Sequence, residues 1–314
     1  MAKIEIPAAL KAELPSNLFG RILSATPIVM TVIATMLAGL ASSEMTKAQY
    51  DRSLAAQQQS KAGDQWSFFQ AKRLRSALQR NTLDLLQASN EIRPLDIAAL
   101  TQPAGAATGT EKVIPLLASE PGQKALDLLQ KGELPTTANA AAQPTEIKDA
   151  LKAIEDLKPD AEIAALLAKI SHKLLTETIV SAKEQTDAFD EATKPVNQLI
   201  DALDAALQQQ PASPAKLAFI ATRLRFAALR YDAEARLNQS IANLYELQVR
   251  KNNISAERHH QRSQRFFYGM LGAQLAVIMS TFAIAARQRN LLWILAAAAG
   301  ITALLFAAYV YLYV

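Results

Sequence analysis

The sequence predicts an all-α protein with three transmembrane helices, a long antiparallel helical stalk and a small helical head. Three observations carry this prediction. The 314-residue chain is 50% hydrophobic but only 20% charged, and its mean hydropathy of +0.05 indicates a few very apolar segments in an otherwise polar chain. Three long segments contain no charged residue. Ala, Leu and Gln dominate, with only 10 Gly and 13 Pro, which favours helices over turn-rich sheets.

Each uncharged segment is long enough to cross a bilayer, because about 20 helical residues span a hydrocarbon core of about 30 Å. The segments are residues 22–43, 266–286 and 291–314. Only four residues separate the last two, which predicts a transmembrane hairpin over residues 266–314. A cleaved signal peptide is the alternative for the first segment, but its length and the polar tail at residues 1–21 favour a span.

The first and second spans should continue outside the membrane as the two helices of the stalk. Residues 44–90 contain no Pro and a single Gly, so an ascending helix should reach about 70 Å beyond the span. Ser213 and Pro214 have the residue types of an N-cap and a first helical position, which predicts a descending helix over residues 214–265.

Two helices that leave and re-enter one membrane must be antiparallel, so Ser43 and Phe266, at the ends of the first two spans, should lie at the same level. We therefore expect the numbers of facing residues to add to about 309. The largest apolar side chains of the stalk then meet at one height and should pack as a waist. They are Trp66, Phe69, Ile241, Leu244 and Tyr245.

The head is predicted to occupy residues 91–213 and to be acidic. This segment has 11 basic and 19 acidic residues, whereas the two stalk segments together have 17 basic and 8 acidic ones. Helices are expected to begin near Ser119, at Thr145 and at Asp160, and Pro195 should break or kink the last of them. Residues 102–112 read as a loop and 136–144 as a linker. An acidic head between basic stalk segments suggests that the head docks a basic protein partner. The alternative is that these charges only solvate the exposed faces of the helices.

The sequence offers few residues for catalysis or metal binding. The chain has no Cys and three His, which excludes disulfides, thiolate metal sites and cysteine nucleophiles. Residues 105–110 lack the spacing and the Lys of a phosphate-binding loop. Glu257 and His260 form one Glu-x-x-His step, whereas four-helix di-iron sites use two. We therefore expect no catalytic residues, no cofactor, no metal site and no nucleic-acid partner.

Within the membrane segments, small residues recur four positions apart, as at helix–helix contacts. These steps predict close packing, within or between chains, at Gly269, Gly272, Ala273, Ala276 and Gly300. The spans contain no charged residue, and Gln274 is their strongest polar residue, for which helix–helix hydrogen bonding is expected. Arginines beside the spans are expected to contact lipid headgroups. They are Arg258, Arg262, Arg265, Arg287 and Arg289.

Residues 64–72, with the sequence DQWSFFQAK, resemble the core of a bacterial family, the domain of unknown function 4337 family. The resemblance extends to the order of the segments: a polar start, one span, a helix with this aromatic core, and a final two-span hairpin divided by the Arg-rich turn at 287–289. It covers roughly residues 21–90 and 230–314, while residues 91–213 look longer than the usual family insert. The resemblance implies a membrane topology and assigns no catalytic residue.

These features favour a non-enzymatic, membrane-anchored scaffold that self-associates as a homo-oligomer of three or more chains. The alternatives are an accessory subunit of a membrane enzyme or transport complex, and an oligomeric pore. The lipid bilayer is the other expected partner, and a bacterial inner membrane the expected location. Basic residues of the tail and of the 287–290 turn place the large domain in the periplasm, whereas Arg258, Arg262 and Arg265 argue for the reverse orientation.

Overall fold

The fold was analysed in a computed structural model, which describes residues 18–96, 113–136, 143–208, 213–285 and 289–313. These residues form eight helices, and no strand occurs among them, so the all-α prediction is confirmed. Most of the predicted tail, of the 102–112 loop and of the 136–144 linker, together with Arg287, lies outside the described residues.

Three helices are long and apolar enough to cross a membrane, so the chain has the helices of a three-span membrane protein. The helices α1 and α8 each contain 72 residues, and α9 contains 25. Their bounds are Leu18–Ser89 for α1, Pro214–Ala285 for α8 and Arg289–Tyr313 for α9. As predicted, α8 begins at Pro214, where the Ser213 hydroxyl accepts a hydrogen bond of 3.2 Å from the backbone N–H of Lys216.

The chain forms two compact units. One, here called the membrane unit, comprises residues 1–56 and 250–314, and the other, the stalk-and-head unit, comprises residues 57–249. Both α1 and α8 contribute to each unit, whereas α9 belongs to the membrane unit alone.

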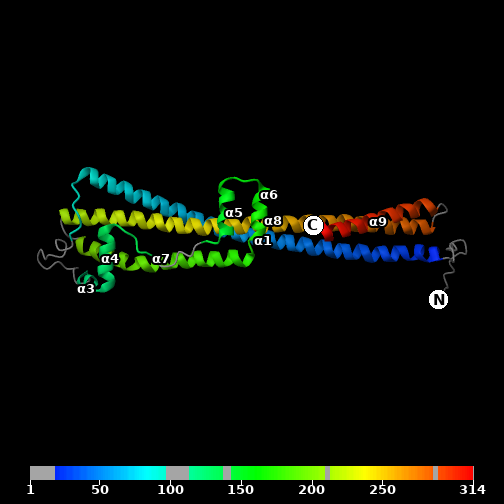
Figure 1. Cartoon of the computed structure of the whole chain (residues 1–314), viewed down its shortest axis with the longest axis horizontal. Helices are drawn as coiled ribbons and strands as arrows, with labels where there is room; N and C mark the ends of the chain where they lie inside the picture. The colour runs from blue at the N-terminus through cyan, green and yellow to red at the C-terminus, as the bar shows by residue number, and fades with distance from the viewer. Residues whose placement is uncertain (1–17, 97–112, 137–142, 209–212, 286–288, 314) are drawn as a thin grey trace, which may run out of the picture. The chain divides into compact units, whose positions relative to one another are not determined.

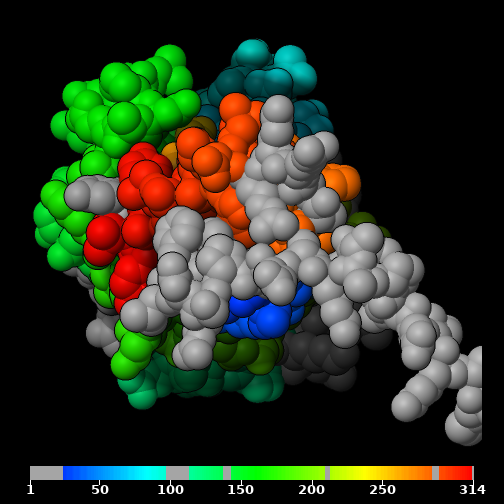
Figure 2. Space-filling view, turned by 90° about the vertical axis from the view of Figure 1, so that its right-hand side faces the viewer, coloured from blue at the N-terminus to red at the C-terminus, as the bar shows by residue number. Residues whose placement is uncertain are grey.

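In the membrane unit, small residues bring α1, α8 and α9 into contact. Figure 2 shows the end of α8 (orange) beside α9 (red). One apolar cluster joins Met30 and Ala34 of α1 to Ala273 and Ala276 of α8 and to Ala303 of α9.

A second cluster of the membrane unit joins Leu37 and Ala41 to Phe266 and Val310. Large apolar side chains face outward on all three helices, as lipid contact requires. Examples are Val32, Met36, Ile278, Phe282, Ile301 and Leu305.

In the stalk-and-head unit, five shorter helices accompany α1 and α8. Figure 1 shows α3 and α4 near the end of α7, and α5 and α6 near its start. The bounds are Val113–Ala118 for α3, Glu120–Lys131 for α4, Thr145–Glu155 for α5, Asp160–Lys169 for α6 and His172–Leu207 for α7. The head core is apolar and includes the fully buried Leu129, Leu199, Phe219 and Phe226.

The first head helix follows its sequence signals. The Ser119 hydroxyl accepts a hydrogen bond of 3.2 Å from the N–H of Gly122 at the start of α4. Gly132 ends α4 in the left-handed conformation, with φ +65°, which a glycine adopts without steric cost.

The predicted starts of the next two head helices are confirmed, but the second is shorter than expected. As predicted, α5 begins at Thr145, and Pro144 occupies its cap position without a side-chain hydrogen bond. The helix expected from Asp160 onward is divided, because Ser171 accepts a hydrogen bond of 3.0 Å from the N–H of Leu174 and starts α7. Pro195 lies inside α7 without breaking it.

Alanine lines the contact between α1 and α8. A buried alanine recurs every seventh residue of α1 at Ala34, Ala41, Ala48, Ala55 and Ala62. The same period occurs on α8 at Ala221, Ala228, Ala235 and Ala242, with Val249 at the next position and Ala256 at the one after. Small residues at one position of each heptad let two helices approach closely along their length.

Hydrogen bonds fix the register of this contact separately in each unit. Ser263 donates to the carbonyl of Ala41 at 2.7 Å in the membrane unit, and Ser76 donates to the carbonyl of Ala228 at 2.9 Å in the stalk-and-head unit. Both pairs of residue numbers add to 304. The expected sum of about 309 is thus about five higher than the sum at these two hydrogen bonds.

Candidate functional site

No metal centre is assembled from the described residues, where no group of three or more His, Asp or Glu side chains could hold an ion. The Glu-x-x-His step of α8 is divided between two sets of partners. Glu257 accepts a hydrogen bond from Gln261 at 3.1 Å and lies 3.9 Å from Arg52. The Nε2 atom of His260 lies 3.0 Å from the amide nitrogen of Gln264.

A charged cluster ties α1, α7 and α8 together in the stalk-and-head unit. The buried carboxylate of Glu234 pairs with Lys72 of α1 and lies 3.2 Å from Nε of Arg230. Arg230 also donates to the side-chain oxygen of Asn197 on α7. The ring of Tyr231 lies 5.4 Å from the Lys72 ammonium and 4.7 Å from the Arg230 guanidinium, within the range of cation–π attraction.

The second acidic residue of this region, Asp232, is also buried. It pairs with Arg73 of α1 and accepts a hydrogen bond of 2.8 Å from Arg236. Burial alone would raise the pKa of Asp232, but the hydrogen bond from Arg73 and the charge of Arg236 more than offset it and lower the pKa. Asp232 is therefore held ionised.

On α7, burial and then the nearby charge of Glu234 raise the pKa of Asp190. The signal for the whole cluster was present in the sequence: opposite charges occur at matching heights of α1 and α8.

The predicted waist residues lie in the same unit but do not form one apolar layer. Trp66 and Phe69 are partly buried and contact each other edge to face, with ring centroids 5.4 Å apart. Trp66 Nε1 donates a hydrogen bond of 2.7 Å to Glu246 Oε1.

On the α8 side of the predicted waist, Ile241, Leu244 and Tyr245 are buried. The Tyr245 ring lies 6.0 Å from the Lys61 ammonium of α1 and 5.6 Å from the Lys183 ammonium of α7. Tyr245 thus contacts polar groups from both neighbouring helices.

One face of α1 has no partner in the described part of the chain. Its side chains recur at alternating spacings of four and three residues, which is the pattern of a heptad seam. The face consists of Ser67, Ala71, Leu74, Leu78, Asn81, Leu85 and Ala88. Leu74, Leu78 and Leu85 are 63%, 54% and 70% exposed. We call this face the outer α1 stripe.

The small residues predicted to pack in the membrane lie at contacts within the chain. A Cβ atom on Gly269 would lie 3.3 Å from Leu37, and one on Gly300 would lie 3.3 Å from Met30. On Gly272, a Cβ would lie 3.4 Å from the Cβ of Ala303. Ala273 and Ala276 are fully buried in the same bundle.

Gln274 is exposed and has no hydrogen-bond partner within the described part of the chain. Among the predicted headgroup arginines, Arg258 is exposed, while Arg262 and Arg265 are partly buried and Arg289 begins α9. The guanidinium of Arg265 lies 5.2 Å from the Tyr309 ring.

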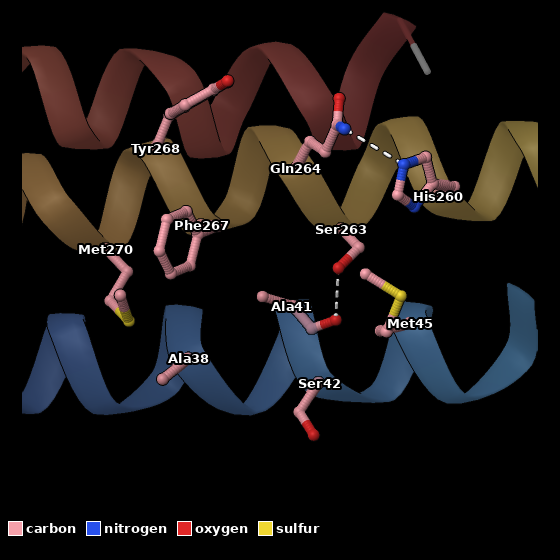
Figure 3. A pocket seen from close by; sticks show the side chains of 10 residues that line it. All are labelled: Ala38, Ala41, Ser42, Met45, His260, Ser263, Gln264, Phe267, Tyr268 and Met270. Atoms are coloured by element: carbon pink, nitrogen blue, oxygen red, sulfur yellow. Dashed lines mark hydrogen bonds between the residues drawn. The ribbon is translucent and has the colours of Figure 1, made fainter. Parts of the chain in front are cut away.

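A groove of about 530 Å³ lies between α1 and α8 in the membrane unit. Figure 3 shows Ala38, Ser42 and Met45 on one wall, and Phe267, Gln264 and His260 on the other. Its lining is apolar toward Ala38 and Met270, which belong to the spans, and polar toward His260 and Gln264. Sequence reasoning missed the groove, because it forms only where the two helices meet.

The family model described as Domain of unknown function (DUF4337) matches residues 22–113. The predicted resemblance is thereby confirmed for the first span and the ascending helix, and it stays a prediction for residues 230–314. No curated protein and no solved structure matches the chain.

Proposed function

Starting from the family match and the three candidate spans, we propose that this protein is a membrane-anchored, self-associating helical scaffold without catalytic activity. It forms a homo-oligomer of three or more chains, with contacts along the stalk and in the membrane. The observation that carries the proposal is the outer α1 stripe, whose leucines are more than half exposed. Apolar residues in a heptad pattern pair with other helices, and helices α7 and α8 leave this face uncovered.

The stripe suits parallel pairing between copies. Chains inserted in one membrane with the same orientation have parallel α1 helices. In a parallel coiled coil, residues beside the seam face residues five positions later on the next copy. This would set Gln70 opposite Arg75 and Asp84 opposite Ser89, so no like charges oppose each other along the stripe. Asn81 within the seam would favour a single register.

Gln274 supports a second contact inside the bilayer. Its amide is exposed on a span that is otherwise faced with Leu271, Leu275 and Ile278. A polar amide in hydrocarbon is costly unless it is hydrogen-bonded, and Gln side chains commonly bond between transmembrane helices. A neighbouring copy would supply the partner that the described chain lacks.

The proposed location is a bacterial inner membrane with residues 57–249 in the periplasm. Lys3, Lys11 and Arg21 precede the first span, and two arginines occupy the short turn between the last two. Short basic segments of this kind favour the cytoplasmic side.

Mass and cross-linking together test the self-association. Multi-angle light scattering of the full chain in mild detergent at micromolar concentration should give a mass of at least three protomers. A monomer mass would reject the scaffold. Fixed co-purification with another chain would support the accessory-subunit alternative instead.

Because the chain has no cysteine, single-cysteine variants report contacts cleanly. Leu78→Cys in native membranes should form a disulfide-linked dimer under mild oxidation. The matched control Gln87→Cys, exposed on the same helix but outside the stripe, should not. Equal cross-linking of both variants would argue against the stripe as the interface.

A further inference from the structure

The groove of the membrane unit has the shape and polarity gradient of a lipid site. Ala38, Phe267 and Met270 line the part within the predicted spans, whereas Met45, His260 and Gln264 line the part beyond the span ends at Ser43 and Phe266. The groove therefore passes from the hydrocarbon level to the headgroup level of the predicted bilayer. Its volume of about 530 Å³ lies within the range of small-molecule sites.

The apolar end of the groove is continuous with the surface that faces lipid. Leu40 and Leu271 adjoin it in sequence, on α1 and α8, and both are exposed. Phe267, a lining residue, is itself about half exposed. An acyl chain can thus enter from the bilayer without displacing any part of the protein.

The polar end of the groove supplies hydrogen-bond donors. The amide nitrogen of Gln264 can only donate, so its contact of 3.0 Å makes Nε2 of His260 the acceptor. A neutral His260 then carries its proton on Nδ1. Nδ1 of His260 is buried, so the donor that the groove can reach is Gln264, whose side chain is exposed. Its amide nitrogen carries a second hydrogen, which a phosphate or ester oxygen in the groove can accept.

We propose that the groove binds one glycerophospholipid, with an acyl chain along Ala38, Phe267 and Met270 and the phosphate beside His260 and Gln264. The site is separate from the outer α1 stripe and does not depend on self-association.

Native mass spectrometry of the full chain in mild detergent, titrated with dioleoylphosphatidylglycerol, tests the proposal. The wild type should retain one lipid per chain. Ala38→Phe fills the groove and should weaken retention by about tenfold. The matched control is Gly39→Phe on the neighbouring residue, where an added Cβ has no atom within 4 Å; it should retain lipid as the wild type does. Equal retention by all three proteins, or equal loss in both variants, would overturn the site.

Two further probes identify what the groove recognises. Dioleoylglycerol, which lacks the phosphate, should bind at least about tenfold more weakly than the phospholipid, and His260→Ala should remove this preference. Inorganic phosphate alone should not compete. Competition by phosphate, equal binding of dioleoylglycerol, or a fall in oligomer mass in Ala38→Phe with unchanged lipid retention would each overturn the proposal, the last because a second copy would then occupy the groove.

Discussion

Nδ1 of His259 lies 2.5 Å from Oε2 of Glu44, and this pair joins α8 to α1 just outside the predicted first span. The same carboxylate accepts a hydrogen bond of 2.7 Å from Lys47. Burial alone would raise the pKa of Glu44, but the hydrogen bonds from Lys47 and His259 outweigh it, so the pKa lies below its ordinary value. The ionised form of Glu44 therefore stabilises the contact between the two helices.

The first prediction concerns pH. Because the pKa of Glu44 is lower in the folded protein, its contribution to stability is complete above the unfolded pKa of about 4.3 and is lost as pH falls through the folded pKa. Thermal unfolding in detergent between about pH 6 and pH 3 should therefore have a shallower pH dependence in Glu44→Gln than in the wild type. The control is Glu191→Gln, at an exposed glutamate. If the pH dependence of unfolding became equally shallow in this variant, the effect would not be specific to Glu44.

The second prediction concerns Trp66. Its indole is only partly buried, so Trp66→Ala should cost less than the roughly 3–5 kcal/mol expected for a fully enclosed aromatic. Trp66→Phe keeps the ring contact with Phe69 but loses the hydrogen bond to Glu246, and should cost about 1 kcal/mol. Chemical unfolding measures both. No loss in Trp66→Phe would show that the hydrogen bond to Glu246 adds nothing to stability.

The third prediction compares two neighbouring positions on α1. Ala62 is fully buried in the alanine seam, so Ala62→Leu should force the helices apart and cost about 1–3 kcal/mol. Gly63 faces open space, with no atom within 4 Å of an added Cβ. Gly63→Ala should stabilise the helix by about 0.5–1 kcal/mol. Opposite changes in melting temperature are expected, and changes of the same sign would contradict the seam.

The fourth prediction concerns Gly122 in the first turn of α4. A Cβ atom there would lie 1.7 Å from the carbonyl oxygen of Leu116. The backbone of α3 must therefore move in Gly122→Ala, and the α3–α4 corner should unfold more readily. Amide hydrogen exchange should increase in residues 113–131, with little change in the spans. Unchanged exchange in those residues would show that the corner absorbs a methyl group.

The fifth prediction concerns the membrane contact of the proposed oligomer. Gln274→Leu removes an exposed amide and suits lipid better, so it would leave an isolated chain at least as stable. If Gln274 bonds to a neighbouring copy, association should weaken by about 0.6–2 kcal/mol. Thr302→Val is the control, since the hydroxyl of Thr302 already donates to its own helix at 2.8 Å. Light scattering over a dilution series would measure the association of both variants. Unchanged association in Gln274→Leu would confine the contact between copies to the stalk.

The spans and the long helices could be predicted because their signals are local. Uncharged segments of about 20 residues can satisfy their backbone in lipid only as helices. Outside the spans, no proline interrupts α1 over residues 44–89 or α8 over residues 215–265. The start of α8 is likewise encoded within two residues, Ser213 and Pro214.

The packing could not be predicted in the same way. The predicted waist relied on large apolar residues such as Trp66 and Tyr245, whereas the residues buried at regular intervals along both helices include Ala62 and Ala242, which are common residues with little individual signal. The break between α6 and α7 was missed because Ile163, Leu167 and Ile170 are all buried on one apparent helix face. Ile170 nevertheless has an extended backbone, and Ser171 caps the next helix.

The alanine seam repeats every seven residues, so α1 and α8 could pack in more than one register. Sliding one past the other by one repeat, about 10 Å at 1.5 Å per residue, would set alanine against alanine again. In the stalk-and-head unit, two ion pairs distinguish these registers, because Lys72 pairs with Glu234 and Arg73 pairs with Asp232. A slide would separate both pairs and leave Glu234 and Asp232 buried with only the arginines of their own helix, Arg230 and Arg236, which is unfavourable. The alanines thus permit close approach, and the charged pairs favour one alignment among those that the repeat allows.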